Sequence, residues 1–279
     1  MQITSQHRQR FTISFLVIFY VLAIYKLING LWLFQAGPYF FVNRFDGITW
    51  MLMQTGIHQW LLYNKTGWIL FDLAFYAMPL AWYFAYKSNE FAGTVVAIIW
   101  LVVNWIYVQC YTLYPINSIE AHIAWLLMPL LFATTRIKSF YFLMHGLRYF
   151  FLFFFASAGI WKLRQGGFFY PEQMSGILLM QHADYLVSAP GILFTKYIYW
   201  LVKHPAIGQG LYVAATLLEL FFVIGFFSRK YDRWLLAGFG LFLLSDQLLM
   251  RIPYYEVLPM ALPLFFSKYK EPVTEVSLT

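Results

Sequence analysis

Several ionisable or polar side chains interrupt long apolar stretches of this sequence, where an ionised group is expensive. They are the basic residues Lys26, Arg148 and Lys162, the acidic residues Asp72, Glu219, Asp246 and Glu256, and the neutral Gln109 and His122. An ionised group near the centre of a bilayer costs at least about 2.5–3.5 kcal/mol on insertion scales. We therefore expect these side chains to form ion pairs with one another or to line a wet cavity.

Most of these residues are expected at one depth. When positions are counted along each predicted span in its own direction, the outer half holds Lys26, Asp72, Gln109, His122, Lys162, Asp246 and Glu256. This placement predicts a polar chamber that opens toward the extracytoplasmic face. Simpler explanations stay open for each residue. Lys162 ends its span, so its side chain can extend to the lipid headgroups. His122 can mark a helix end, and Asp246 and Glu256 can be solvated at the outer boundary.

A second, deeper group is expected around Arg148. Arg148 and Lys162 are 14 residues apart on one predicted span, so they share a helix face at a separation of about 21 Å. On the next span, Tyr212, Thr216 and Glu219 form a polar stripe at helical spacing. We predict a structural ion pair between Arg148 and Glu219, which would neutralise both charges in a dry interior.

The elements that must position these residues are transmembrane helices. Of 279 residues, 61% are hydrophobic and only 11% charged, against roughly a quarter charged in soluble domains. A bilayer core of roughly 30 Å needs about 20 apolar residues as helix. We predict an all-α, polytopic bundle that forms a single integral membrane domain over residues 1–279. Its spans, about eight in number, are 11–34, 68–86, 91–112, 121–135, 140–162, 206–227, 234–250 and 254–266.

Two further segments are predicted to lie outside the spans. Residues 48–63 are amphipathic and interrupted by polar residues, which indicates an interfacial segment. Residues 164–203 are expected to form a polar extracytoplasmic loop with a short amphipathic piece near 192–202. The lone Cys110 excludes an intramolecular disulfide, and no metal site is predicted.

The distribution of basic residues predicts the orientation. The net charge of +7 comes from residues that lie between apolar spans, which fits membrane orientation better than nucleic-acid binding. With both termini in the cytoplasm, every short cytoplasmic loop carries Lys or Arg, whereas the short outer loop Leu113–Ile119 has neither. We expect no cleaved signal peptide and a location in a bacterial inner membrane.

One stretch resembles a known family. Leu147-Arg148, followed by Ala158-Gly159-Ile160-Trp161-Lys162-Leu163, resembles the "LR…aGl-x-KL" signature of the HTTM family, which includes vitamin K-dependent gamma-carboxylase. Asn117 to His122, and Glu219 ahead of Ser228-Arg229, are similar to further features of that family. The resemblance covers roughly residues 90–268. We expect no counterpart of the carboxylase's lumenal domain, and Asp246-Gln247 stand where the family commonly has a histidine.

The resemblance implies a chemistry. In the carboxylase the lysine of this motif is the proposed catalytic base, and Lys162 matches it. The family couples oxidation of a reduced quinone to removal of a carbon-bound proton, so the resemblance implies a quinone cofactor. His122 would then orient a substrate oxygen or shuttle a proton. A lysine partly removed from water near the membrane surface is suited to act as a base.

Two classes of function follow. The first is a quinone-linked membrane enzyme with Lys162 as base in an outward-facing chamber. The second is a non-catalytic subunit or anchor of a multiprotein membrane complex, in which Lys162 is bridged within the chain. Both predict membrane lipids as partners, and the second also predicts protein partners within the membrane. A transporter is a third hypothesis, but the sequence shows no clear internal symmetry.

Overall fold

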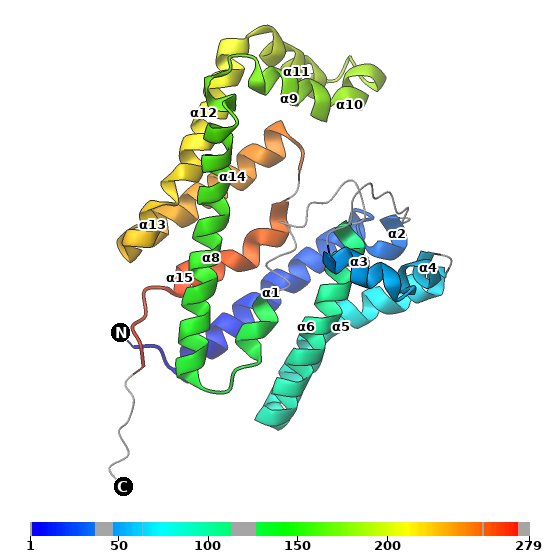
Figure 1. The fold of residues 1–279 in the computed structure, drawn as a ribbon, viewed down its shortest axis with the longest axis vertical. Coiled ribbons are helices and arrows are strands. Elements are labelled where there is room, and N and C mark those ends of the chain that lie inside the picture. Colours follow the sequence, from blue (N-terminus) through cyan, green and yellow to red (C-terminus); the bar gives the residue numbers. More distant parts are fainter. Residues whose placement is uncertain (1, 37–46, 63, 113–126, 253, 273–279) are drawn as a thin grey trace. The chain divides into compact units, whose positions relative to one another are not determined.

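The protein is helical throughout the part of the chain that its structure describes (Figure 1). This computed structural model describes residues 2–36, 47–62, 64–112, 127–252 and 254–272, apart from the side chains of a few helical residues such as Gln109. Within these ranges no strand occurs, and a single isolated bridge joins Gln2 to Lys270. The predicted all-α class is confirmed.

Among the described residues, five helical stretches are long and apolar enough to cross a membrane. They are Ser5–Gln35, Lys65–Ser88, Glu90–Val108, Ile137–Arg164 and Pro205–Phe227. The helices within them are α1 (Ser5–Ile28), α2 (Leu33–Ala36), α5 (Lys65–Ser88), α6 (Glu90–Thr112), α8 (Ile137–Arg164), α12 (Pro205–Phe221) and α13 (Ile224–Phe227). These apolar helices are typical of an integral membrane protein.

The predicted total of about eight spans stays a prediction. The helix α14 (Asp232–Leu249) has 18 residues and is not among the five. The last apolar stretch is shorter still, and consists of η3 (Tyr254–Met260) and α15 (Ala261–Phe266). Much of the predicted span 121–135 lies outside the described residues. The helices α3 (Gly47–Gln54) and α4 (Ile57–Leu62) are each too short to span, as expected for the segment 48–63.

Helix α1 shows how the sequence specifies both a core face and a lipid face. Phe11, Phe15 and Phe19 recur every four residues and are fully buried. On another face Val17 is 58% exposed and Ile28 is 78% exposed. A continuous apolar stripe that protein does not cover is costly in water but favourable against lipid tails. The pattern therefore supports a membrane setting for α1.

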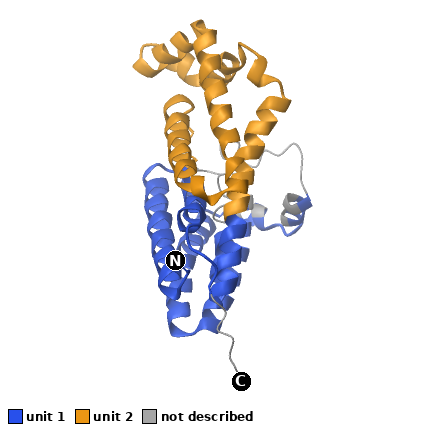
Figure 2. Cartoon of the chain, turned by 90° about the vertical axis from the view of Figure 1, so that its left-hand side faces the viewer, with its two compact units in different colours: residues 1–147, 255–279 blue, residues 148–254 orange. Residues whose placement is uncertain are grey.

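The chain divides into two compact units (Figure 2). Unit 1 comprises residues 1–147 and 255–279, and unit 2 comprises residues 148–254. Unit 1 is built around an aromatic core in which the Trp100 and Phe132 rings stack at 5.7 Å. A single membrane domain that includes both units stays a prediction.

Unit 2 differs from the sequence prediction in residues 164–203. In place of a polar loop with one amphipathic piece, the structure has η1 (Gly167–Phe169), α9 (Gln173–Gln181), α10 (Ala183–Ser188) and α11 (Leu193–Lys203). These helices pack on α12 around a core of Met174, Leu178, Leu186, Ile198, Leu201 and Tyr212. Intervening polar residues hid the apolar positions, although Met174 and Leu178 are spaced for one helix face. The expected amphipathic piece corresponds to α11.

Candidate functional site

Lys162 and Glu219 form an ion pair in unit 2. Lys162 lies near the end of α8 and Glu219 near the end of α12, and their Nζ and Oε1 atoms are 2.7 Å apart. The Lys162 side chain is 27% exposed, whereas that of Glu219 is only 4% exposed. The pair therefore has one accessible, proton-carrying partner and one buried partner.

A glycine allows the two helices to approach closely enough for this pair. A Cβ atom added at Gly159 would lie 2.9 Å from Cγ of Leu220 and 3.1 Å from its backbone nitrogen. Real Cβ atoms essentially never approach another heavy atom that closely, so a larger residue would push α12 away. Gly159 stands three residues before Lys162, close to one helical turn, and Leu220 follows Glu219 directly. The small residue therefore helps to set the distance between ammonium and carboxylate.

The pair has further polar neighbours within unit 2. The Lys162 ammonium lies 5.6 Å from the centre of the Tyr212 ring, and Tyr212, Thr216 and Glu219 are all buried on α12. The predicted polar stripe is thus a buried face. Asp246 of α14 lies within electrostatic range of both Lys162 and Glu219. Glu219 Oε2 and Asp246 Oδ2 are buried without a hydrogen-bond partner among the described residues.

Arg148 pairs with Asp232, so the predicted Arg148–Glu219 ion pair is wrong. Asp232 begins α14, and its two carboxylate oxygens accept hydrogen bonds from Arg148 Nε at 2.8 Å and Nη2 at 2.5 Å. Nη2 also donates to the carbonyl of Gly225. Glu219 lies more than a helical turn before Gly225 in sequence, where it meets Lys162 instead. Asp232 lies between the predicted spans 206–227 and 234–250 and was therefore not considered as a partner for Arg148.

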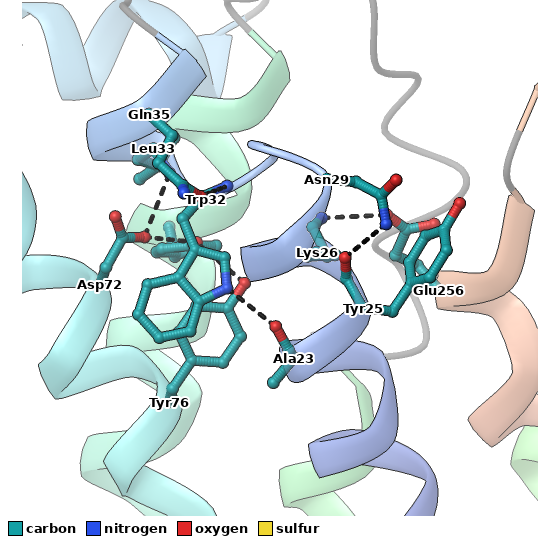
Figure 3. Close-up of polar contacts among 11 residues, drawn as sticks. Ala23, Tyr25, Lys26, Asn29, Trp32, Leu33, Gln35, Asp72, Tyr76 and Glu256 are labelled. Atoms are coloured by element: carbon teal, nitrogen blue, oxygen red, sulfur yellow. Dashed lines mark hydrogen bonds and ion pairs between the residues drawn. The ribbon is translucent and has the colours of Figure 1, made fainter.

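Unit 1 buries its own ionic pair (Figure 3). Lys26, near the end of α1, donates to Glu256 Oε1 at 2.9 Å, and both side chains are less than one-tenth exposed. Asp72 of α5 is fully buried and accepts hydrogen bonds from the backbone amides of Leu33 and Phe34 and from the Tyr107 hydroxyl at 2.7 Å. Asp72 therefore holds the turn after α1 against α5.

These contacts bring together some of the residues that were predicted to line the chamber. Lys26, Asp72 and Glu256 are buried among partners in unit 1, and Lys162 and Asp246 are neighbours in unit 2. His122 and the side chain of Gln109 lie outside the described residues. A single chamber lined by the whole set stays a prediction. Among the described residues, no group of three or more His, Cys, Asp or Glu side chains is arranged to hold a metal ion.

Two partners were missed from the sequence. The sequence does mark Asp232 as a candidate, because an acidic residue at the start of a helix is favoured by the helix dipole. Such a residue is worth testing as a partner for a buried arginine. Tyr107 has no such signal, since the chain has 21 tyrosines and nothing local distinguishes this one.

Fold and site together define an α-helical protein of membrane type with buried ion pairs in both units. No family model matches the chain, and neither does any curated protein or solved structure.

Proposed function

We propose that the protein is an integral membrane enzyme that is linked to a quinone and uses Lys162 as a base. The observation that carries the proposal is the Lys162–Glu219 pair, in which the lysine is accessible and the carboxylate is buried with one unpartnered oxygen. The resemblance of the residues around Lys162 to the HTTM signature supports the same role. On this proposal the chain belongs to that family's membrane core, and His122 assists the proton transfer.

The pair offers a route to a neutral amine. Burial penalises the charged carboxylate, particularly when one of its oxygens has no hydrogen bond. The proton of the 2.7 Å hydrogen bond can then pass from Nζ of Lys162 to Oε1 of Glu219. The neutral amine left behind can remove a proton from a hydroxyl of a reduced quinone, which gives a quinolate and restores the ammonium. Asp246 lies within electrostatic range of this ammonium.

A difference spectrum tests the proposal. The purified chain in lipid nanodiscs is titrated anaerobically with 2,3-dimethyl-1,4-naphthoquinol, because a quinolate and a quinol absorb differently in the near ultraviolet. We expect a saturable quinolate signal from the wild type and none from Lys162→Ala. Lys196→Ala removes an exposed lysine from α11 of the same unit and should retain the signal. A wild type without quinolate, or a Lys162→Ala variant with the full signal, contradicts the proposal.

The second candidate is a non-catalytic subunit or anchor in a multiprotein membrane complex. It is favoured by one observation, namely that Lys162 is bridged within the chain. It predicts that an intramembrane protein partner co-purifies in fixed stoichiometry after mild solubilisation, and that the quinol titration gives no signal. Under both candidates we propose a bacterial inner membrane with cytoplasmic termini, on the strength of the basic residues of the short loops.

A further inference from the structure

A cavity of about 370 Å³ lies in unit 1, far in sequence from Lys162. It is located where α1 and α6 begin, where α5 ends, and beside the turn that leads into α8. All four of these helices belong to candidate membrane spans, and each contributes one of its ends to the cavity. The cavity therefore lies where apolar spans give way to the polar boundary of a membrane.

One positive charge is built into the cavity wall. Arg8 is only 6% exposed, and its guanidinium donates to the carbonyl of Thr135 at 2.8 Å and to the carbonyl of Thr134. It also lies over the Tyr86 ring, 4.9 Å from the ring centre. These contacts use two of the five N–H groups of the guanidinium and hold it in place. The arginine is therefore a fixed cation in a largely dry wall.

Exposed charges line the rim. Lys87 is exposed, and its ammonium lies 4.7 Å from the centre of the Tyr83 ring. Glu90 contributes one carboxylate. With Arg8, the charged groups of the lining sum to one net positive charge, which is the complement of a single phosphodiester.

Three aromatic side chains, Trp82, Tyr83 and Tyr86, form one side of the remaining wall, beside uncharged polar residues and Ile137. Trp82 is 1% exposed, and its ring stacks against that of Tyr86 at 5.5 Å. A free inorganic anion needs no such apolar wall, and an apolar ligand gains nothing from Arg8. An amphiphile with an anionic head uses both features.

We propose that this cavity binds the phosphodiester headgroup of an anionic phospholipid. Arg8 and Lys87 contact the phosphate, and the glycerol backbone packs against Trp82 and Tyr86. On the predicted topology this end of unit 1 faces the cytoplasm, where basic residues attract anionic lipid. The proposal is independent of Lys162 and its chemistry.

The experiment uses the full chain, delipidated in a neutral detergent. Its melting temperature is followed by tryptophan fluorescence during titration with dihexanoyl-phosphatidylglycerol, dihexanoyl-phosphatidylcholine or inorganic phosphate. We expect a saturable rise with the phosphatidylglycerol and no comparable rise with the other two. Lys87→Ala should weaken the apparent affinity about fivefold, the effect typical of one basic residue at a lipid surface.

Two further variants distinguish binding in the cavity from nonspecific attraction of the lipid to the basic residues of the protein. Lys138→Ala removes a half-exposed lysine that follows the lining residue Ile137 but pairs with Glu271 and is not itself part of the lining. This variant should bind like the wild type. Gln9→Trp fills the cavity from its exposed rim without changing the charge, and it should abolish the saturable rise.

Three results would overturn the proposal. The first is an equal response to both lipids, which indicates a detergent-like effect. The second is an equal loss in Lys87→Ala and Lys138→Ala, which indicates diffuse attraction. The third is binding of inorganic phosphate as tight as that of the lipid.

Discussion

Replacement of Asp232 by asparagine tests the most deeply buried ionic contact of the structure. The Arg148 side chain is fully buried, the Asp232 side chain is 5% exposed, and two hydrogen bonds join them. Asp232→Asn keeps the shape but removes the negative charge, so it leaves the guanidinium among neutral partners, namely the asparagine oxygen, the Gly225 carbonyl and the Tyr149 ring. Breaking a buried pair in this way costs about 3–5 kcal/mol of unfolding free energy.

The assay is equilibrium unfolding of the purified chain in mixed dodecylmaltoside and sodium dodecyl sulfate micelles, followed by circular dichroism. Asp184→Asn is the matched control, because Asp184 also lies in the first turn of a helix in unit 2 but is exposed. It should change the free energy by no more than about 0.5 kcal/mol. The double replacement Arg148→Met with Asp232→Leu should recover most of the loss, since no buried charge is then left unpaired.

A double-mutant cycle decides between the two pairings of Arg148. The changes in unfolding free energy caused by Arg148→Met and Asp232→Asn should be strongly non-additive in the double variant. The changes caused by Arg148→Met and Glu219→Gln should add within about 0.3–0.5 kcal/mol, as for residues that share no contact. Equal stabilities of Asp232→Asn and Asp184→Asn, or strong coupling of Arg148 to Glu219, would refute the reasoning.

Three further substitutions test other contacts by the same unfolding assay. Lys26→Met removes the ammonium that pairs with the buried Glu256 carboxylate and should cost about 3–5 kcal/mol. Addition of Glu256→Gln should restore much of this loss, and a single variant as stable as the wild type would contradict the pairing. Asp72→Ala leaves two backbone amides without their acceptor and should cost at least about 2 kcal/mol of unfolding free energy. An unchanged stability would show that contacts other than those of Asp72 hold the turn after α1. Gly159→Ala should cost about 1–3 kcal/mol through overpacking against α12. Gly146→Ala lies in the same helix, has no atom near its added Cβ, and should be neutral or stabilising. If Gly146→Ala were the more destabilising of the two, α8 and α12 would not be in close contact.

The long apolar helices were predictable because they depend on local composition. Each of the five span-length stretches overlaps a predicted span, since about 20 apolar residues and their flanking polar residues are read directly from the chain. The face of α1 that is buried follows from the four-residue recurrence of Phe11, Phe15 and Phe19. By contrast, the helices of residues 164–203 were missed, because short helices that share a small core have weak individual patterns.

Within the apolar stretches, the sequence itself indicated which ionisable residues are buried, because such a side chain must find a partner whatever the fold. Lys26, Asp72, Arg148 and Glu219 were all identified in this way, and all are buried. Asp232 lies outside the predicted spans and is also buried, and it was not identified in this way. The partners were decided only by tertiary structure. A salt bridge depends on a few ångströms of helix position, which is set by close approach at Gly159 and by the turn around Gly225 rather than by sequence spacing. For this reason Glu219 meets Lys162, and Arg148 meets Asp232.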